Sequence, residues 1–433
     1  MDAQSLPKEL IGEISNSLAL KDAIAFGLVS KGFITNLSRP DFGYKIKQPI
    51  KISVICDTNN DYTRRKYAVG NFKQLLVSGL DELNHFREQQ ETLFLSLTHI
   101  TFDSNFNQSI DKLILPPTLT HLTFGFIFNR LVNNLKLPVT LTHLTFGYRF
   151  NQPIDKLHLK HQLSLTHLTF GEYFNQSIER LYLPFSLVQL TFKGRFNSSV
   201  DNLNIQHLSS LTHLIFGACF NQSVDKLQLP ESLTHLVFGE YFNQSVDKLK
   251  LPQSLTHLIF GYNFNQSINK LNAFPSLTHL TLGLRFNQDI AYILLPQSLK
   301  HLTISPDFAK SFTRLKLPKS LTHLTLDYFF SKSIDELKLP ESLTHITICP
   351  VNCFNSLGGL TLPETLTHLT FSPYFNQSID ELQLPKSLTH LTFGVKYDKS
   401  EEYLAFLSLS FPHLIIQKSP FANSCLALFV DKF

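Results

Sequence analysis

The chain has 433 residues, of which 43% are hydrophobic and 17% charged, a composition that excludes wholesale disorder. No run of 18 uninterrupted apolar residues occurs, which excludes an ordinary membrane-spanning helix. The net charge of +4, from 38 basic and 34 acidic residues, is too balanced to favour nucleic acid as a partner.

The N-terminus and the cysteines bear on localisation. Asp2, Lys8 and Glu9 stand where a signal peptide would need an apolar stretch. The five cysteines are an odd number spread thinly along the chain, as is typical of free thiols. We therefore expect a protein of the reducing cytoplasm or of the nucleus.

Residues 1–46 predict a small helical module. Pro7 stands where a helix N-terminus tolerates proline, and apolar residues follow at helical spacing in two segments. These residues are Ile11, Ile14 and Leu18 in the first segment and Ile24, Phe26, Leu28 and Val29 in the second. A helical hairpin of this size is too small to be stable alone, so we expect it to need a partner surface.

The pattern of this module, LPKELIGEIS followed by LKDAIAFGLVSKGF, is similar to the F-box. The resemblance implies that the module packs on the Skp-type adaptor of a cullin-RING ubiquitin ligase. The implied adaptor contacts are Leu6, Pro7, Ile11, Ile14, Leu18, Leu28 and Val29. A hairpin that merely caps the rest of the fold is the alternative that the residues leave open.

Residues 47–92 fit neither the helical module nor the repeat that follows, and we assign them as a linker and N-terminal cap. Lys51 to Cys56 alternates like a strand, and Phe72 to Leu83 is either a worn repeat or a capping element. A stack of repeats needs caps at its ends to cover its core. Residues 395–433 receive the same assignment at the C-terminus.

Residues 93–394 carry a repeat of about 22 residues, clearest where SLTHLVFGEYFNQSVDKLKLP precedes SLTHLIFGYNFNQSINKL. The His of the LTHL tetrad recurs thirteen times, and Gln189 replaces it once, so fourteen coils are countable. A degenerate fifteenth is expected around His413. Two columns of the repeat, Phe after LT and Phe before Asn, hold 23 of the 39 phenylalanines, so Phe makes the repeated core.

Each coil predicts a short strand followed by a turn. In the coil of His257, Leu258 and Phe260 alternate with polar or outward positions and point inward. Gly follows the first Phe column in eight coils, as a turn that needs positive φ would favour. Apolar residues from Val246 to Leu251 predict a second strand on the opposite side, closed by Pro252. Stacked coils then give a mainly-β fold, a curved parallel-β solenoid.

The second half of the coil carries a specific resemblance. Phe150 to Ile154 reads FNQPI and Phe174 to Ile178 reads FNQSI, each followed by an L-x-LP-like stretch, and this pattern resembles the FNIP repeat. That family is regarded as a variant leucine-rich repeat and is abundant in amoebae and in the giant DNA viruses that infect them. Ala309 and Ser331 depart from the pattern where Asn is expected, so those coils are expected to be looser.

The repeated polar residues have structural explanations. The His column is expected to form an outward ladder of neutral imidazoles that pack edge against edge, and such parallel ligands cannot converge on a metal ion. The Asn column is expected to satisfy backbone groups of adjacent coils. Cys349 and Cys353 form a lone pair that indicates a turn variant and not a zinc knuckle. Phosphate loops, nucleophile elbows and HExxH are absent from the sequence, so we expect no catalytic residue, metal or cofactor.

The two residues after the Gly column vary most among coils, and we call these positions the rim. Rims of this kind commonly carry binding loops, and Tyr and Arg are frequent hot-spot residues. The candidate target-binding residues are Tyr148, Arg149, Tyr173, Tyr241, Tyr262 and Arg285, with the His/Thr sheet face as the alternative.

The two modules together predict a non-catalytic adaptor, monomeric on its own. The F-box resemblance implies binding of the Skp-type adaptor and cullin of the host cell, and the solenoid is expected to hold a protein substrate. The competing hypothesis is an interaction scaffold that sequesters a host protein without ubiquitination. Neither nucleic acid nor membrane is expected as a partner.

Overall fold

The computed structural model describes residues 74–419, except 289–293, 305–314, 329–336, 351–356, 358, 373–374, 377 and 398–400. The helical module expected at 1–46, with its seven candidate adaptor contacts, and the strand expected at Lys51 to Cys56 lie outside the described residues. The chain divides into two compact units, Met1–Tyr148 and Arg149–Phe433. None of the helices in the described part is long and apolar enough to cross a bilayer.

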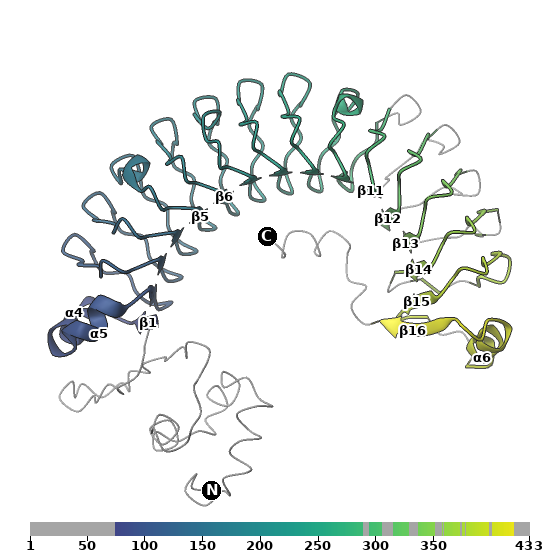
Figure 1. Cartoon of the computed structure of the whole chain (residues 1–433), viewed down its shortest axis with the longest axis horizontal. Helices are drawn as coiled ribbons and strands as arrows, with labels where there is room; N and C mark the ends of the chain where they lie inside the picture. Colours follow the sequence, from purple (N-terminus) through teal and green to yellow (C-terminus); the bar gives the residue numbers. More distant parts are fainter. Residues whose placement is uncertain are drawn as a thin grey trace, which may run out of the picture. The chain divides into compact units, whose positions relative to one another are not determined.

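The described part of the first unit, residues 74–148, contains four parallel strands and two helices (Figure 1). Its elements are β1 (Gln74–Val77), α4 (Leu80–Gln89), α5 (Glu91–Ser96), β2 (His99–Phe102), β3 (His121–Thr123) and β4 (His143–Thr145). β1 pairs with β2 so that Gln74 lies opposite His99. The sheet therefore begins before the repeat is recognisable in the sequence.

The second unit continues with one strand per coil, and in Figure 1 its strands line the inner side of the curve while the turns stand outside. Its strands are β5 (His167–Phe170), β6 (Gln189–Phe192), β7 (His213–Ile215), β8 (His235–Val237), β9 (His257–Ile259), β10 (His279–Thr281), β11 (His301–Ile304), β12 (His323–Tyr328), β13 (His345–Pro350), β14 (His368–Phe371), β15 (His390–Gly394) and β16 (Ile415–Ser419). The helices in its described residues are η4 (Leu159–His161), η5 (Leu271–Ala273) and α6 (Glu401–Ser410).

The His column sets the register of the sheet. His257 pairs with His279, and β10 pairs with β11 through His279 and His301, so identical residues face each other across neighbouring strands. A further strand follows β15, but Ile415 lies opposite His390, not His413. The expected degenerate coil around His413 is therefore displaced by two residues.

The core is built from the two Phe columns, as the composition indicates. Within one coil, the rings of Phe238 and Phe242 stack with centroids 4.0 Å apart. Between coils, Phe238 lies 5.6 Å from Phe260, and Phe242 lies 6.0 Å from Phe264. Where the first column changes to aliphatic residues, these too are buried: Leu282, Ile304, Leu326 and Ile348. The substitution of a whole block of neighbours keeps the core close-packed.

The prediction of a second strand opposite the first is wrong. Over the described coils, the segment equivalent to 246–251 is a turn, and regular pairing there is limited to a single bridge between Gln228 and Lys250. The Leu249 N–H donates to the Val246 carbonyl at 3.1 Å. Because this local bond takes up backbone groups that a ladder would need, the side opposite the sheet consists of turns.

The explanation of the Gly column by positive φ is also wrong. Among the described glycines, Gly194 alone has a positive φ, of 34°. At Gly239 a Cβ atom would lie 1.9 Å from the carbonyl oxygen of Gly217, one coil earlier. Gly is needed because the backbones of successive coils approach closely just after the strand.

Candidate functional site

The His column forms stacked ladders on the strand face. From His213 to His390 the ring centroids of successive histidines lie 3.9–4.2 Å apart, with interplanar angles of 5–23°. In the first unit His99, His121 and His143 stack at 4.0 and 4.1 Å. The rings therefore stack face to face and not edge against edge, because parallel register gives every ring the same orientation.

In the coils where a Thr precedes the His, that Thr fixes the tautomer of the His; Lys300 takes this position before His301. Thr256 Oγ1 lies 3.1 Å from the carbonyl oxygen of Thr234 and 2.8 Å from Nδ1 of His257. A hydroxyl has a single proton, and a carbonyl can only accept, so the hydroxyl donates to the carbonyl. Nδ1 of His257 must then carry a hydrogen and donate to Oγ1, which leaves Nε2 as an acceptor.

The stacked histidines from His213 to His368 are neutral at physiological pH, because burial lowers the pKa of each. Burial, and then repulsion from neighbouring imidazoles, lowers the pKa of His235, His257, His279 and His345 to about 4. Each ring stacked on another would meet a like charge if both were protonated. The strand face thus presents imidazole, Thr and apolar side chains, with the charge of Lys300 beside His301, and Ile215, Val237 and Ile259 form a buried cluster.

A metal site does not fit this ladder. Stacked parallel rings direct their nitrogen lone pairs in one direction, whereas a zinc ion needs ligands that converge at about 2 Å. Within the described ranges no group of three or more His, Cys, Asp or Glu side chains is placed to hold a metal ion. Cys349 is buried in β13, which corrects the prediction of a turn for this residue, and Cys353 lies outside the described residues.

The Asn column has the predicted structural role, which the hydrogen bonds confirm. Asn243 Oδ1 accepts a hydrogen bond from the backbone N–H of Asn265 at 2.8 Å and another from Nε2 of Gln266 at 3.0 Å. The same bond joins Asn221 to Asn243 at 2.9 Å. The side chain of each coil therefore satisfies the backbone of the next, so this column holds the coils together.

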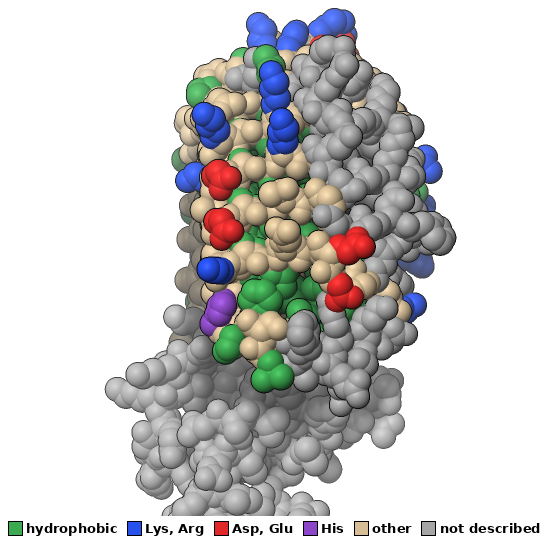
Figure 2. Space-filling model, turned by 90° about the vertical axis from the view of Figure 1, so that its right-hand side faces the viewer, with side chains coloured by type: hydrophobic (Ala, Val, Ile, Leu, Met, Phe, Trp, Pro, Cys, Tyr) green, Lys and Arg blue, Asp and Glu red, His purple; other side chains and the backbone are tan. Residues whose placement is uncertain are grey.

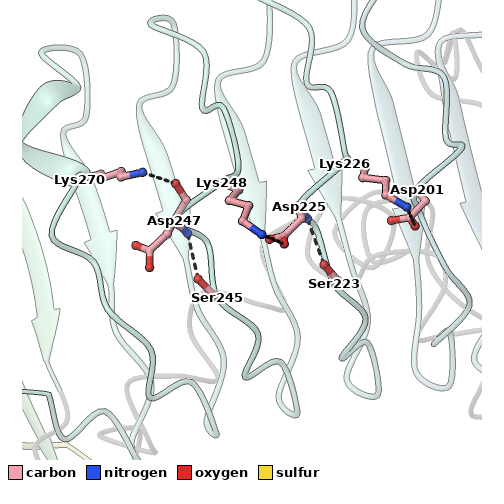
Figure 3. Close-up of polar contacts among 8 residues, drawn as sticks. All are labelled: Asp201, Ser223, Asp225, Lys226, Ser245, Asp247, Lys248 and Lys270. Atoms are coloured by element: carbon pink, nitrogen blue, oxygen red, sulfur yellow. Dashed lines mark hydrogen bonds and ion pairs between the residues drawn. The ribbon is translucent and has the colours of Figure 1, made fainter.

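Lysines and aspartates on the turns opposite the sheet form a second repeated pattern (Figure 3). Lys226 pairs with Asp201 and Lys248 pairs with Asp225, both at 3.0 Å, and Lys270 Nζ donates to the Asp247 carbonyl. The lysine side chains are about three-quarters exposed, at 74% and 76% for the two ion pairs. Such exposed pairs contribute little stability, so the column is a solvated face.

The rim residues lie in the turns that follow the strands. Tyr148 and Tyr241 are exposed to 42% and 52%, and Arg149 and Arg285 are exposed as well. Tyr173 and Tyr262 are half-buried. Tyr148 belongs to the first unit and the other five residues to the second.

Aromatic rings and guanidinium groups meet on the rim. In the first unit Phe126 and Tyr148 stack with centroids 4.4 Å apart. In the second, the Arg195 guanidinium lies 3.9 Å from the centre of the Tyr173 ring, and that of Arg285 lies 5.5 Å from Tyr262. Arg195 was missed in the sequence because Lys193 takes the Gly position in its coil. Alignment of this coil on the second Phe column, at Phe196, places Arg195 on the rim.

Comparison with known families decides the affiliation of the chain. The FNIP repeat model matches residues 90–126, 128–159, 163–194, 209–241, 242–276, 275–307, 308–349 and 355–396, more than half of the chain. The chain belongs to the FNIP repeat family. None of the curated proteins compared with it matches.

Solved structures resemble the FNIP solenoid to different degrees. CroV588, described as a novel circular LRR protein, is 38% identical with a TM-score of 0.51; the match covers 71% of this chain and 51% of CroV588. An LRR protein of Leptospira interrogans is 15% identical, with a TM-score of 0.42 and coverages of 75% and 90%. An internalin of Listeria monocytogenes is 15% identical, with a TM-score of 0.40 and coverages of 68% and 80%. The FNIP chain thus spans about half the length of CroV588.

The residues that define the FNIP repeat build the frame of the solenoid. Phe of the motif fills the core, and Asn and Gln make bonds between coils. The rim residues are the ones that differ among coils while the frame beneath them repeats.

The surface that Figure 2 shows, which is the right-hand side of Figure 1 turned to the viewer, carries charged side chains of both signs scattered among uncharged ones.

Proposed function

We propose that this chain is a non-catalytic substrate-recognition adaptor of a Skp-cullin-F-box ubiquitin ligase. The FNIP solenoid would hold a target protein, and residues 1–46 would bind the Skp-type adaptor. Repeat solenoids are typical of interaction proteins because they offer an extended surface on a regular frame. The support for the ligase half is the F-box-like pattern of Leu6, Pro7 and the apolar positions that follow.

The rim carries the target-binding half of the proposal. Phe, Asn and Gly fix the frame of each coil, so the two rim positions do not need to vary for stability. Their variation among coils, and the Tyr and Arg found there, are better explained by binding. Exposed Tyr and Arg are the residue types that contribute most to protein interfaces. Tyr241 and Arg285, both exposed, stand two coils apart in this position.

The test is affinity purification of the full chain from cells, next to a Leu6→Ala/Pro7→Ala variant. Retention of the Skp-type adaptor and cullin by the wild type, and their loss from the variant with the target still bound, is the expected result. Absence of the adaptor from both purifications refutes the ligase role. A target captured without the adaptor would instead identify a scaffold that sequesters its partner.

The rim has a separate test in the same purification. Charge reversal of Arg149 and Arg285 to Glu should abolish target capture while leaving the adaptor bound. Capture that persists in this variant would move the target site to the His/Thr face.

A further inference from the structure

Three exposed arginines share one position of the rim in the second unit. Arg149, Arg195 and Arg285 each stand directly before the second Phe column of their coil. Across the described residues, none of their guanidinium groups makes an ion pair or a side-chain hydrogen bond. Lys226 and Lys248, by contrast, are each paired with an aspartate. The charges of the rim are therefore available to a partner.

Two of these arginines lie over tyrosine rings. The Arg195 guanidinium lies 3.9 Å from the centre of the Tyr173 ring, and Arg285 lies 5.5 Å from Tyr262. Stacking uses the flat face of the guanidinium and leaves the N–H groups at its edge free to donate. An oxyanion could then bind in bidentate fashion with less loss of side-chain freedom than on an unrestrained arginine.

Acidic residues stand on the rim between the arginines. Glu172 lies in the coil between those of Arg149 and Arg195, and Glu240 lies between those of Arg195 and Arg285. A uniformly acidic partner would place carboxylates against these glutamates. The arrangement favours a partner whose negative charges are spaced to meet the arginines and to avoid the glutamates.

We propose that the rim binds an extended protein segment whose carboxylates or phosphates are spaced to match Arg149, Arg195 and Arg285. The proposal rests on the proposed function, of which it specifies the target class. The observation behind it is that three arginines occupy the same position of different coils with their guanidinium groups unpaired, two of them over tyrosine rings.

The spacing of the coils fixes the spacing of the charges. Arg149 and Arg195 are two coils apart, and Arg195 and Arg285 are four coils apart. At about 4.8 Å per strand, these intervals are about 10 and 19 Å. An extended chain advances about 3.4 Å per residue, so the intervals correspond to about three and about six residues. The matching segment has oxyanions at its first, fourth and tenth positions.

The experiment measures binding of fluorescein-labelled peptides to the full chain by anisotropy. One peptide has aspartates at its first, fourth and tenth positions among Gly and Ser, and the control peptide has the same composition with its three aspartates adjacent. We expect the spaced peptide to bind at least about tenfold more tightly. A third peptide, with phosphoserine at the three spaced positions, shows which oxyanion the rim prefers.

Variants assign the binding to the rim. Arg195→Gln should weaken the spaced peptide about tenfold, and Arg195→Lys should restore only part of the loss, because lysine keeps the charge without the planar fork. Lys226→Gln, with the same loss of charge on the opposite side, should leave the affinity unchanged. Equal binding of the two aspartate peptides, or equal loss in Arg195→Gln and Lys226→Gln, would overturn the proposal as unspecific attraction.

The outcome is separable from that of the proposed function. A cellular target captured equally by the wild type and by Arg195→Gln refutes this inference alone. Specific binding of the spaced peptide by a chain that retains no Skp-type adaptor refutes the ligase role alone.

Discussion

Removal of one Asn side chain from the ladder should loosen the next coil. In an Asn221→Ala variant the N–H of Asn243 loses its acceptor at 2.9 Å, and Nε2 of Gln244 loses a bond of 3.1 Å. The side chains of Asn221 and Gln244 are half-buried. A backbone donor left without a partner costs about 1–2 kcal/mol, and the lost amide bond adds about 0.5–1 kcal/mol. The opening free energy of the following turn should fall by about 2 kcal/mol.

Hydrogen exchange measures this loss directly. A change of about 2 kcal/mol corresponds to roughly thirtyfold faster exchange of the Asn243 amide, since 1.4 kcal/mol is about tenfold. Asn221→Asp is the matched control, because a carboxylate can accept from both donors and should keep the amide protected. Exchange in Asn221→Ala within about threefold of the wild type, or an Asp variant as fast as Ala, would refute the role assigned to the ladder.

Three further outcomes are expected. The pKa values of the stacked histidines from His213 to His368 are lowered in the folded state, to about 4 for His257, so the unfolded chain binds more protons than the folded chain below the ordinary histidine pKa of 6.5. The stabilisation should therefore be complete above pH 6.5 and decrease as the pH falls towards 4. Thermal unfolding across this pH range measures it, and His257→Gln should make the melting temperature depend less on pH. A melting temperature that does not change with pH contradicts the prediction. Gly239→Ala should lower the denaturation midpoint, because its Cβ atom would lie 1.9 Å from the carbonyl oxygen of Gly217. Gly79→Ala is the control and should leave the midpoint unchanged, because the nearest atom to its Cβ would lie 3.5 Å away. Equal effects of the two substitutions would reject the close-approach explanation. Phe242→Ala should cost about 3–5 kcal/mol in urea unfolding, since the side chain is fully buried among four phenylalanine rings, and a loss below about 1 kcal/mol would contradict the core assignment.

The positions of β2 to β15 could be predicted from the sequence, because a His opens each of these strands except β6, which Gln189 opens. His257 opens β9 and His279 opens β10, and their pairing follows once identical residues are stacked. The burial of the Phe columns follows from the same alternation. Family affiliation was predicted from FNQPI and FNQSI and is shown by the family model.

Other features depend on contacts between coils that one coil does not reveal. Gly239 predicts a turn with positive φ when its own segment is considered, but its function is to admit the backbone of the preceding coil. The apolar residues around Leu249 alternate as in a strand, yet the local bond to Val246 makes a turn. Arg195 escaped notice because its coil shifts Gly by one residue. The adaptor contacts expected at residues 6–29 stay a prediction.

The bonds of the Asn ladder have a direction, and this direction governs how the chain can change in length. Acceptors belong to the earlier coil and donors to the later one, in the pair Asn197 to Asn221 as in Asn221 to Asn243. The first of these pairs spans 24 residues and the second 22, so two extra residues pass outside the ladder without breaking it. A whole coil can thus be duplicated or deleted with every remaining donor still matched. The array can lengthen or shorten by complete coils during evolution, and each added coil brings a new pair of rim residues.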